Sequence, residues 1–130
     1  YGRTLFNALI LTETYPDNGY LHAMIGKCLY QLYWHQKNHE LGNVLALPDP
    51  RFDENYDRYL TFVHTLRLVE LASLSYYYTD SKKDIYATDE DFLYARWLCS
   101  HTEVSNEEPD KIKAEYLVKF PSGRYISSIK

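Results

Sequence analysis

Two similar turns, far apart in the sequence, constrain the fold of this chain more than any other feature. Residues 15–20 read Tyr-Pro-Asp-Asn-Gly-Tyr, and residues 120–125 read Phe-Pro-Ser-Gly-Arg-Tyr. Each turn follows a stretch with helical periodicity. Proline removes an amide donor and stops a helix, and asparagine or glycine accepts the backbone angles of a tight turn. The sequence therefore predicts helices that are separated by proline turns of one kind.

The distance between the turns indicates a repeated unit. Pro16 and Pro121 are 105 residues apart (121 minus 16), which is close to three units of the ~34-residue period of helix-turn-helix repeats. This spacing favours a stacked array of helices over an enzyme built around a single pocket.

Apolar residues recur at the spacing of a buried helical face along most of the chain. Helices are predicted over residues 4–14, 20–38, 55–78 and 89–101, with a fifth that ends near Phe120 and a sixth that opens at 125–130. The residues expected to face the core from the second helix onward are Leu21, Ile25, Cys28, Leu29, Leu32, Tyr33, Tyr59, Phe62, Val63, Leu66, Val69, Phe92, Ala95, Leu98, Cys99, Ile112, Tyr116 and Leu117.

Local signals predict where these helices begin and end. Asp89 is expected to cap the fourth helix, where negative charge suits the positive end of the helix dipole. Ser105 and Glu108 fit a capping box at the fifth. The polar residues 79–84 are expected to end the third helix, within which Arg67 and Glu70 can pair.

Gly26 lies inside the second predicted helix, where glycine costs about 1 kcal/mol relative to alanine. We expect it to mark the close approach of another helix. Residues 39–51 form a long loop whose apolar content predicts an ordered segment folded over the helices.

Composition excludes several classes of protein. Hydrophobic residues make up 45% of the chain and aromatic residues 16%, which argues against intrinsic disorder. The formal net charge is −4 and no basic run is present, which argues against nucleic acids and anionic membranes as partners. No apolar stretch reaches the ~20 residues of a membrane span. The chain begins at Tyr1, so we expect residues 1–130 to be one domain of a longer protein.

Residues 15–30 resemble tetratricopeptide-type repeats, in which a turn marked by proline leads into a helix with small residues at its packing face. Pro16, Ala23 and Gly26 match this pattern, and residues 119–126 look like the start of a further unit. The matching residues make up about a fifth of the chain, and residues 39–78 fit no regular repeat. The resemblance implies an all-α fold of antiparallel helix pairs stacked as a right-handed superhelix, whose concave face binds peptides or proteins.

The chain also resembles helical regions that follow the catalytic domain in some bacterial M48-type zinc metallopeptidases. Residues 15–18 and 55–59 carry this likeness. The His-Glu-x-x-His signature of that family is missing, so no catalytic residue can be transferred to this chain. The alternative function is therefore an accessory domain of a peptidase.

No catalytic, cofactor-binding or metal-binding residue is predicted. His35 and His39 have the four-residue spacing of helical zinc ligands, but no third ligand has a defined spacing. The acidic clusters lie at predicted helix starts, where capping explains them. Cys28 and Cys99 are expected to be buried free thiols, with a bridge between helices as the alternative.

The 14 tyrosines suit both helix packing and a binding face, because tyrosine has an apolar ring and a polar tip. Packing is the simpler explanation for most of them. A protein or peptide partner is nevertheless expected, since aromatic residues are enriched at interface hot spots. The candidate contact residues are Tyr30, Tyr33, Trp34, Tyr77 and Tyr94.

Overall fold

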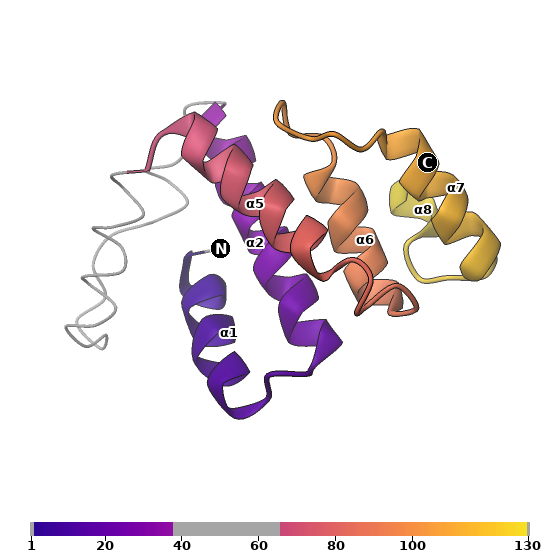
Figure 1. Cartoon of the computed structure of the whole chain (residues 1–130), viewed down its shortest axis with the longest axis horizontal. Helices are drawn as coiled ribbons and strands as arrows, with labels where there is room; N and C mark the ends of the chain where they lie inside the picture. Colours follow the sequence, from indigo (N-terminus) through magenta and orange to yellow (C-terminus); the bar gives the residue numbers. More distant parts are fainter. Residues whose placement is uncertain (1, 38–65, 130) are drawn as a thin grey trace.

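A computed structural model describes residues 2–37 and 66–129 (Figure 1). Its helices are α1 (Gly2–Thr14), α2 (Gly19–Lys37), α5 (Leu68–Lys82), α6 (Glu90–Cys99), α7 (Pro109–Lys119) and α8 (Ile126–Ile129). They pack against one another, and the described residues form no strand. The all-α prediction is confirmed. None of the described helices is long and apolar enough to cross a membrane.

Helix α2 lies at the centre and contacts α1, α5 and α6 (Figure 1). It is antiparallel to α5: His22 near its start bonds Tyr78 near the end of α5, and Gln36 near its end bonds the carbonyl of Leu66. It is parallel to α6, because its first residue, Gly19, adjoins Asp89 and its middle adjoins the last turn of α6. Helix α7 then packs on α6 and α8 follows, at the far end from α1.

The core consists of two larger clusters and a smaller one between α2 and α6. One lies between α1, α2 and α5, and its buried members are Leu5, Ala8, Ile25, Cys28, Leu32, Tyr33, Leu71 and Ala72. The other lies between α6, α7 and α8 and is formed by Leu93, Ile112, Tyr116 and Ile129. Ala23, Phe92 and Ala95 pack between α2 and α6 and connect the two.

Gly26 is the point where α2, α5 and α6 converge, as its place in the sequence predicted. A Cβ on Gly26 would lie 2.8 Å from Thr79 Cγ2 of α5 and 3.6 Å from the Cβ of Ala95 of α6. The Cys99 thiol donates a hydrogen bond to the Gly26 carbonyl at 3.4 Å. Only a residue without a side chain lets both helices approach α2 this closely.

The first aromatic-proline turn is tied to the helices around it. Asn18 Oδ1 accepts a hydrogen bond from the Leu21 amide at 3.1 Å and so caps α2. His22 Nε2 donates to the Pro16 carbonyl at 2.7 Å, and in the neutral ring Nδ1 accepts from the Tyr78 hydroxyl at 2.6 Å. A Cβ on Gly19 would lie 2.3 Å from Asp89 Oδ2, so the turn abuts the start of α6.

The second turn reaches the same end of α6. The Tyr116 hydroxyl donates to Glu90 Oε1 at 2.9 Å and accepts from the Tyr125 amide at 2.9 Å. The Arg124 amide also donates to Glu90, at 2.6 Å. A Cβ on Gly123 would lie 2.2 Å from the Tyr116 hydroxyl oxygen. The two turns therefore bring the starts of α2 and α8 to the start of α6.

The third predicted helix is partly wrong. Residues 55–65 lie outside the described residues, but Leu66 and Arg67 are not helical. Arg67 is extended (φ −80°, ψ 163°) and caps α5, and its expected pairing with Glu70, at 2.9 Å, is confirmed. Val69 is 54% exposed rather than buried. The sequence pattern placed it on the buried face by assuming one continuous helix, whereas α5 begins only at Leu68 and turns a different face to the core. The buried face of α5 is Leu71, Ala72, Ser75, Tyr76 and Thr79.

Other predicted helix ends also need correction. Helix α5 continues to Lys82, because the hydroxyls of Thr79 and Ser81 bond carbonyls of the preceding turn instead of competing with the helix. Ser105 is not a helix cap: its hydroxyl bonds the backbone of Glu107, and α7 begins at Pro109.

Several remaining expectations are settled by burial and hydrogen bonding. Leu117, expected inward, is 38% exposed, because Ile112 and Tyr116 alone face the core from α7.

Asp89 caps α6 as predicted and accepts from the Phe92 amide at 2.9 Å. Cys28 and Cys99 are buried and free, also as predicted. The expected loop 39–51 lies outside the described residues.

The contact at Gly26 predicts an energetic coupling between α2 and α5. Gly26→Ala should lower the free energy of unfolding by about 1 kcal/mol, because overpacking of about 2 kcal/mol exceeds the helix-propensity gain of about 1 kcal/mol. In a Thr79→Ser background, which lacks the clashing methyl group, the same change should raise it. Urea denaturation of the double-mutant cycle measures the coupling.

Ala114→Gly on the exposed face of α7 is the control, because it reports helix propensity without a packing contact. Equal effects of Gly26→Ala in both backgrounds would contradict the close approach.

Candidate functional site

The most suitable binding surface is a groove between α2 and α6, which we call the α2–α6 groove. It consists of two hollows of about 380 and 320 Å³ that share Gln31 and Leu98. The first is lined by Thr4, Met24, Lys27, Cys28, Gln31, Tyr94 and Leu98, and the second by Tyr30, Gln31, Trp34 and Leu98.

Helical periodicity explains which residues reach the groove. On α2, Lys27, Tyr30, Gln31 and Trp34 follow one another at three- and four-residue spacing, which places them along one side of the helix. The buried Ile25 and Leu32 belong to the core instead. On α6, Tyr94 and Leu98 are four residues apart, whereas Phe92, Ala95 and Cys99 are buried. Each helix thus divides its side chains between the core and the groove.

The second aromatic-proline turn supplies a ring beside the groove. Tyr125, just before α8, stacks on Tyr94 with ring centroids 4.0 Å apart and planes within 3°. Its hydroxyl donates a short hydrogen bond to Asp91, which Arg124 also binds at 3.0 Å. Burial and the hydrogen bond to the Asp91 carboxylate raise the pKa of Tyr125 above its ordinary value, so it stays a neutral donor. Tyr94 thus contacts the rings of both Tyr125 and Trp97.

The structure brings three of the five predicted contact residues together. Tyr30, Trp34 and Tyr94 line the α2–α6 groove. Tyr33 is 2% exposed and packs in the core, so in this structure it is not accessible to a partner. Tyr77 is 52% exposed but lies on α5 and lines neither hollow.

Other groove residues were not predicted from the sequence. Lys27 and Gln31 share the helical spacing of Tyr30 and Trp34, so a helical projection of α2 could have found them. Tyr125 carries no local signal, because its position depends on the contacts of the second turn with Asp91 and Tyr94.

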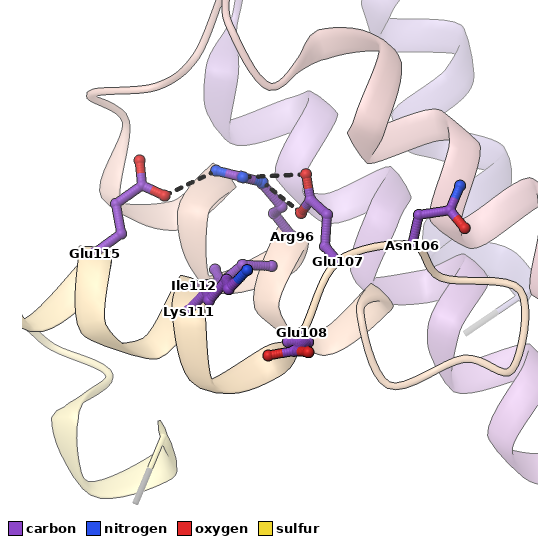
Figure 2. A pocket seen from close by; sticks show the side chains of 7 residues that line it. All are labelled: Arg96, Asn106, Glu107, Glu108, Lys111, Ile112 and Glu115. Carbon is purple, nitrogen blue, oxygen red and sulfur yellow. Dashed lines mark hydrogen bonds and ion pairs between the residues drawn. The ribbon is translucent and has the colours of Figure 1, made fainter.

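A different hollow, of about 240 Å³, lies between α6, the segment before α7, and α7 itself (Figure 2). Figure 2 shows Arg96 reaching across it to two carboxylates. Arg96 makes two hydrogen bonds to Glu107, at 3.0 and 3.1 Å, and one to Glu115 at 3.0 Å. Lys83 also binds Glu107 and Lys119 binds Glu115. The charges satisfy one another, so this network joins α6 to α7 and does not offer a free charge to a ligand.

The cations of this network determine the protonation of Glu115. Burial alone raises the pKa of its carboxyl, but the hydrogen bond from Lys119 and the charge of Arg96 outweigh burial and hold the pKa below its ordinary value. The carboxylate form of Glu115 is therefore favoured in the folded protein.

The two cysteines are poor nucleophiles. Burial raises the pKa of Cys99 to about 12, and burial also raises the pKa of Cys28 despite the nearby positive charge of Lys27. Both thiols are thus protonated at neutral pH, and a protonated thiol does not attack an electrophile effectively.

The described residues contain no group of three side chains suited to hold a metal ion. His35 lies on α2 with its ring edge against Trp34, at a centroid distance of 5.1 Å. His39 lies outside the described residues, so the zinc hypothesis for His35 and His39 stays a prediction.

Comparisons with known protein families, with curated proteins and with solved structures find no match. No family is identified, and the resemblances to tetratricopeptide repeats and to peptidase-associated regions stay predictions.

The Arg96 network predicts a pH-dependent stability. Arg96→Met should lower the free energy of unfolding at pH 7 by about 2 kcal/mol, because Glu107 and Glu115 lose a charged donor. The pKa of the Glu115 carboxyl is lower in the folded protein than in the unfolded chain. Glu115 therefore stabilises the fold at pH values above its unfolded pKa, and this stabilisation is lost as the pH falls through its folded pKa. The difference between wild type and variant should therefore shrink below about pH 4, as measured by urea denaturation across pH.

Lys111→Met is the matched control, since Lys111 borders the same hollow but is exposed. Its effect should stay within about 0.5 kcal/mol. A difference for Arg96→Met that persists unchanged at pH 3 would contradict an ionic role for Arg96.

Proposed function

We propose that this chain is a non-catalytic helical-repeat module that binds an extended segment of a partner protein in the α2–α6 groove. The observation that carries the proposal is that Tyr30, Trp34 and Tyr94 line two adjoining hollows, which share Gln31 and Leu98. Tyrosine and tryptophan are enriched at the few interface positions that contribute most binding energy.

The helix arrangement supports a tetratricopeptide-like superhelix for this module. Helices α2 and α5 are antiparallel. So are α6 and α7, because Glu107, just before α7, binds Arg96 near the end of α6, and Tyr116, near the end of α7, binds Glu90 at the start of α6. The first helices of these pairs, α2 and α6, are parallel neighbours, and α8 starts at the same end. Each aromatic-proline turn leads into one such first helix, α2 or α8. In the proposed superhelix, the groove forms part of the concave face.

The shape and chemistry of the groove suit a peptide better than a compact small molecule. Its two hollows follow one another along α2, and each is open to solvent on one side. Their linings combine apolar side chains, such as Met24 and Leu98, with polar ones, such as Gln31 and Lys27. A peptide in extended conformation presents side chains to such hollows and backbone groups to the polar atoms between them.

The alternative function, an accessory domain of a bacterial zinc metallopeptidase, stays a prediction. No feature of the described residues favours it over the binding module.

The proposal predicts which aromatic side chains matter for binding. Peptides selected by phage display of random linear sequences on the wild-type protein should lose about tenfold or more in affinity for Trp34→Ala and for Tyr94→Ala, because each change removes a wall of the groove. Tyr77→Ala, which removes an exposed aromatic residue outside the groove, should leave affinity unchanged. Isothermal titration calorimetry measures the affinities, and thermal denaturation checks that each variant is folded.

Selected peptides that bind Trp34→Ala and Tyr94→Ala as tightly as wild type would overturn the groove proposal. If only Tyr77→Ala loses affinity, the peptide binds the exposed face of α5 around Tyr77 and not the groove.

A further inference from the structure

The charge of the α2–α6 groove identifies the kind of peptide that it accepts. Building on the function proposed above, we infer that the bound segment carries an acidic side chain, aspartate or glutamate, whose carboxylate binds Lys27. The apolar walls of the groove would hold the residues beside it.

The described residues that line the groove offer hydrogen-bond donors and no negative charge. Of the side chains that line its two hollows, Lys27 carries the positive charge, and Thr4, Tyr30 and Gln31 can each donate a hydrogen bond. Within the part of the chain that the structure describes, neither hollow has an aspartate or a glutamate in its lining. The hollow at Arg96, by contrast, is lined by three glutamates. An acceptor-rich anion therefore fits the α2–α6 groove and not the other hollow.

Lys27 differs from the cations that hold the fold together. Arg96 and Arg124 each bind two carboxylates, and Lys83 does too. Lys27 forms no ion pair with any residue of the described ranges 2–37 and 66–129, although its side chain is half-buried. Among the described residues, no carboxylate neutralises the positive charge of Lys27, which we take to be the charge that a ligand in the groove binds.

The aromatic rings under Lys27 compensate for its burial only in part. Its ammonium nitrogen lies 6.0 Å from the ring centroid of Tyr94 and 5.8 Å from that of Tyr125. These distances are at the outer limit of a cation–π contact, so the attraction is weak. A carboxylate in the adjoining hollow would supply a charge-assisted hydrogen bond, which is roughly twice as strong as a neutral one.

A carboxylate fits better than a phosphate group. Proteins recognise phosphorylated segments with clusters of arginine, which match the double charge and the three oxygens of the phosphate. Among the described residues that line the groove, Lys27 has no second lysine or arginine beside it. Arg124 also lies over the Tyr125 ring, but it pairs with Glu90 and Asp91. One cation among apolar and uncharged polar walls balances a single negative charge.

The test uses the peptides that phage display selects on the wild-type protein. They should be enriched in aspartate and glutamate, and the most enriched peptide, made synthetically, should bind about tenfold or more weakly to Lys27→Glu. Lys27→Arg, which keeps the charge, should retain binding. Lys82→Glu is the matched control, because Lys82 also lies over a tyrosine ring, 5.4 Å from Tyr78, but outside the groove. Its affinity should equal that of wild type.

Each acidic residue of the synthetic peptide is replaced in turn by its amide, asparagine or glutamine. At one position, the amide peptide should bind wild type and Lys27→Glu with equal affinity, and this position identifies the carboxylate that binds Lys27. Selected peptides that need Trp34 and Tyr94, but show no acidic enrichment and bind Lys27→Glu normally, would overturn this inference and leave the groove proposal standing. If no selected peptide depends on Trp34 or Tyr94, both fail. Selected peptides with adjacent acidic residues that lose as much affinity for Lys82→Glu as for Lys27→Glu would also overturn the inference. Such a result would indicate a diffuse electrostatic attraction rather than a contact with Lys27.

Discussion

The close approach of three helices at Gly26 is the constraint on which the rest of the structure depends. The backbone of α2 meets the Thr79 methyl group of α5 and the Ala95 side chain of α6 at this point. Because α5 and α6 both pack against α2 at this point, the orientation of α2 is fixed. One face of α2 is then buried in the core with α1 and α5, and another lines the groove beside α6. A side chain at Gly26 would separate the helices and change the width of the groove.

The start of α6 is the second organising point, and it explains why the two aromatic-proline turns are alike. Gly19 from the first turn adjoins Asp89, and Gly123 from the second adjoins Glu90. Acidic residues are favoured at a helix start by the dipole. Asp89 caps its own helix by accepting from the Phe92 amide, and Glu90 accepts hydrogen bonds from the Tyr116 hydroxyl and the Arg124 amide. This arrangement places Tyr125 on Tyr94 and so connects the end of the chain to the proposed binding surface.

Local patterns in the sequence predicted much of this fold, and tertiary contacts decided what they missed. The helices at 2–14, 19–37, 90–99 and 109–119 follow from periodicity, proline turns and the Asp89 cap. The start of α5 after Arg67 was missed because the apolar pattern of the sequence continues across it, while the cap of α5 consists of a single arginine–glutamate contact. Tyr30 and Tyr33 look equivalent in the sequence, yet one borders the groove and the other is core, because helix α2 packs on both sides. The place of Tyr125 could not be predicted, since contacts with α6 determine it.

Nuclear Overhauser effects at Gly26 test the central claim most directly, because they report distances between specific protons in solution. The account predicts cross-peaks from the Gly26 α protons to the Thr79 γ-methyl and the Ala95 β-methyl protons, since both carbons lie in the contact described above. Clear resonances for all three residues without these cross-peaks would contradict the convergence of α2, α5 and α6. The α2–α6 groove would then lose its structural basis.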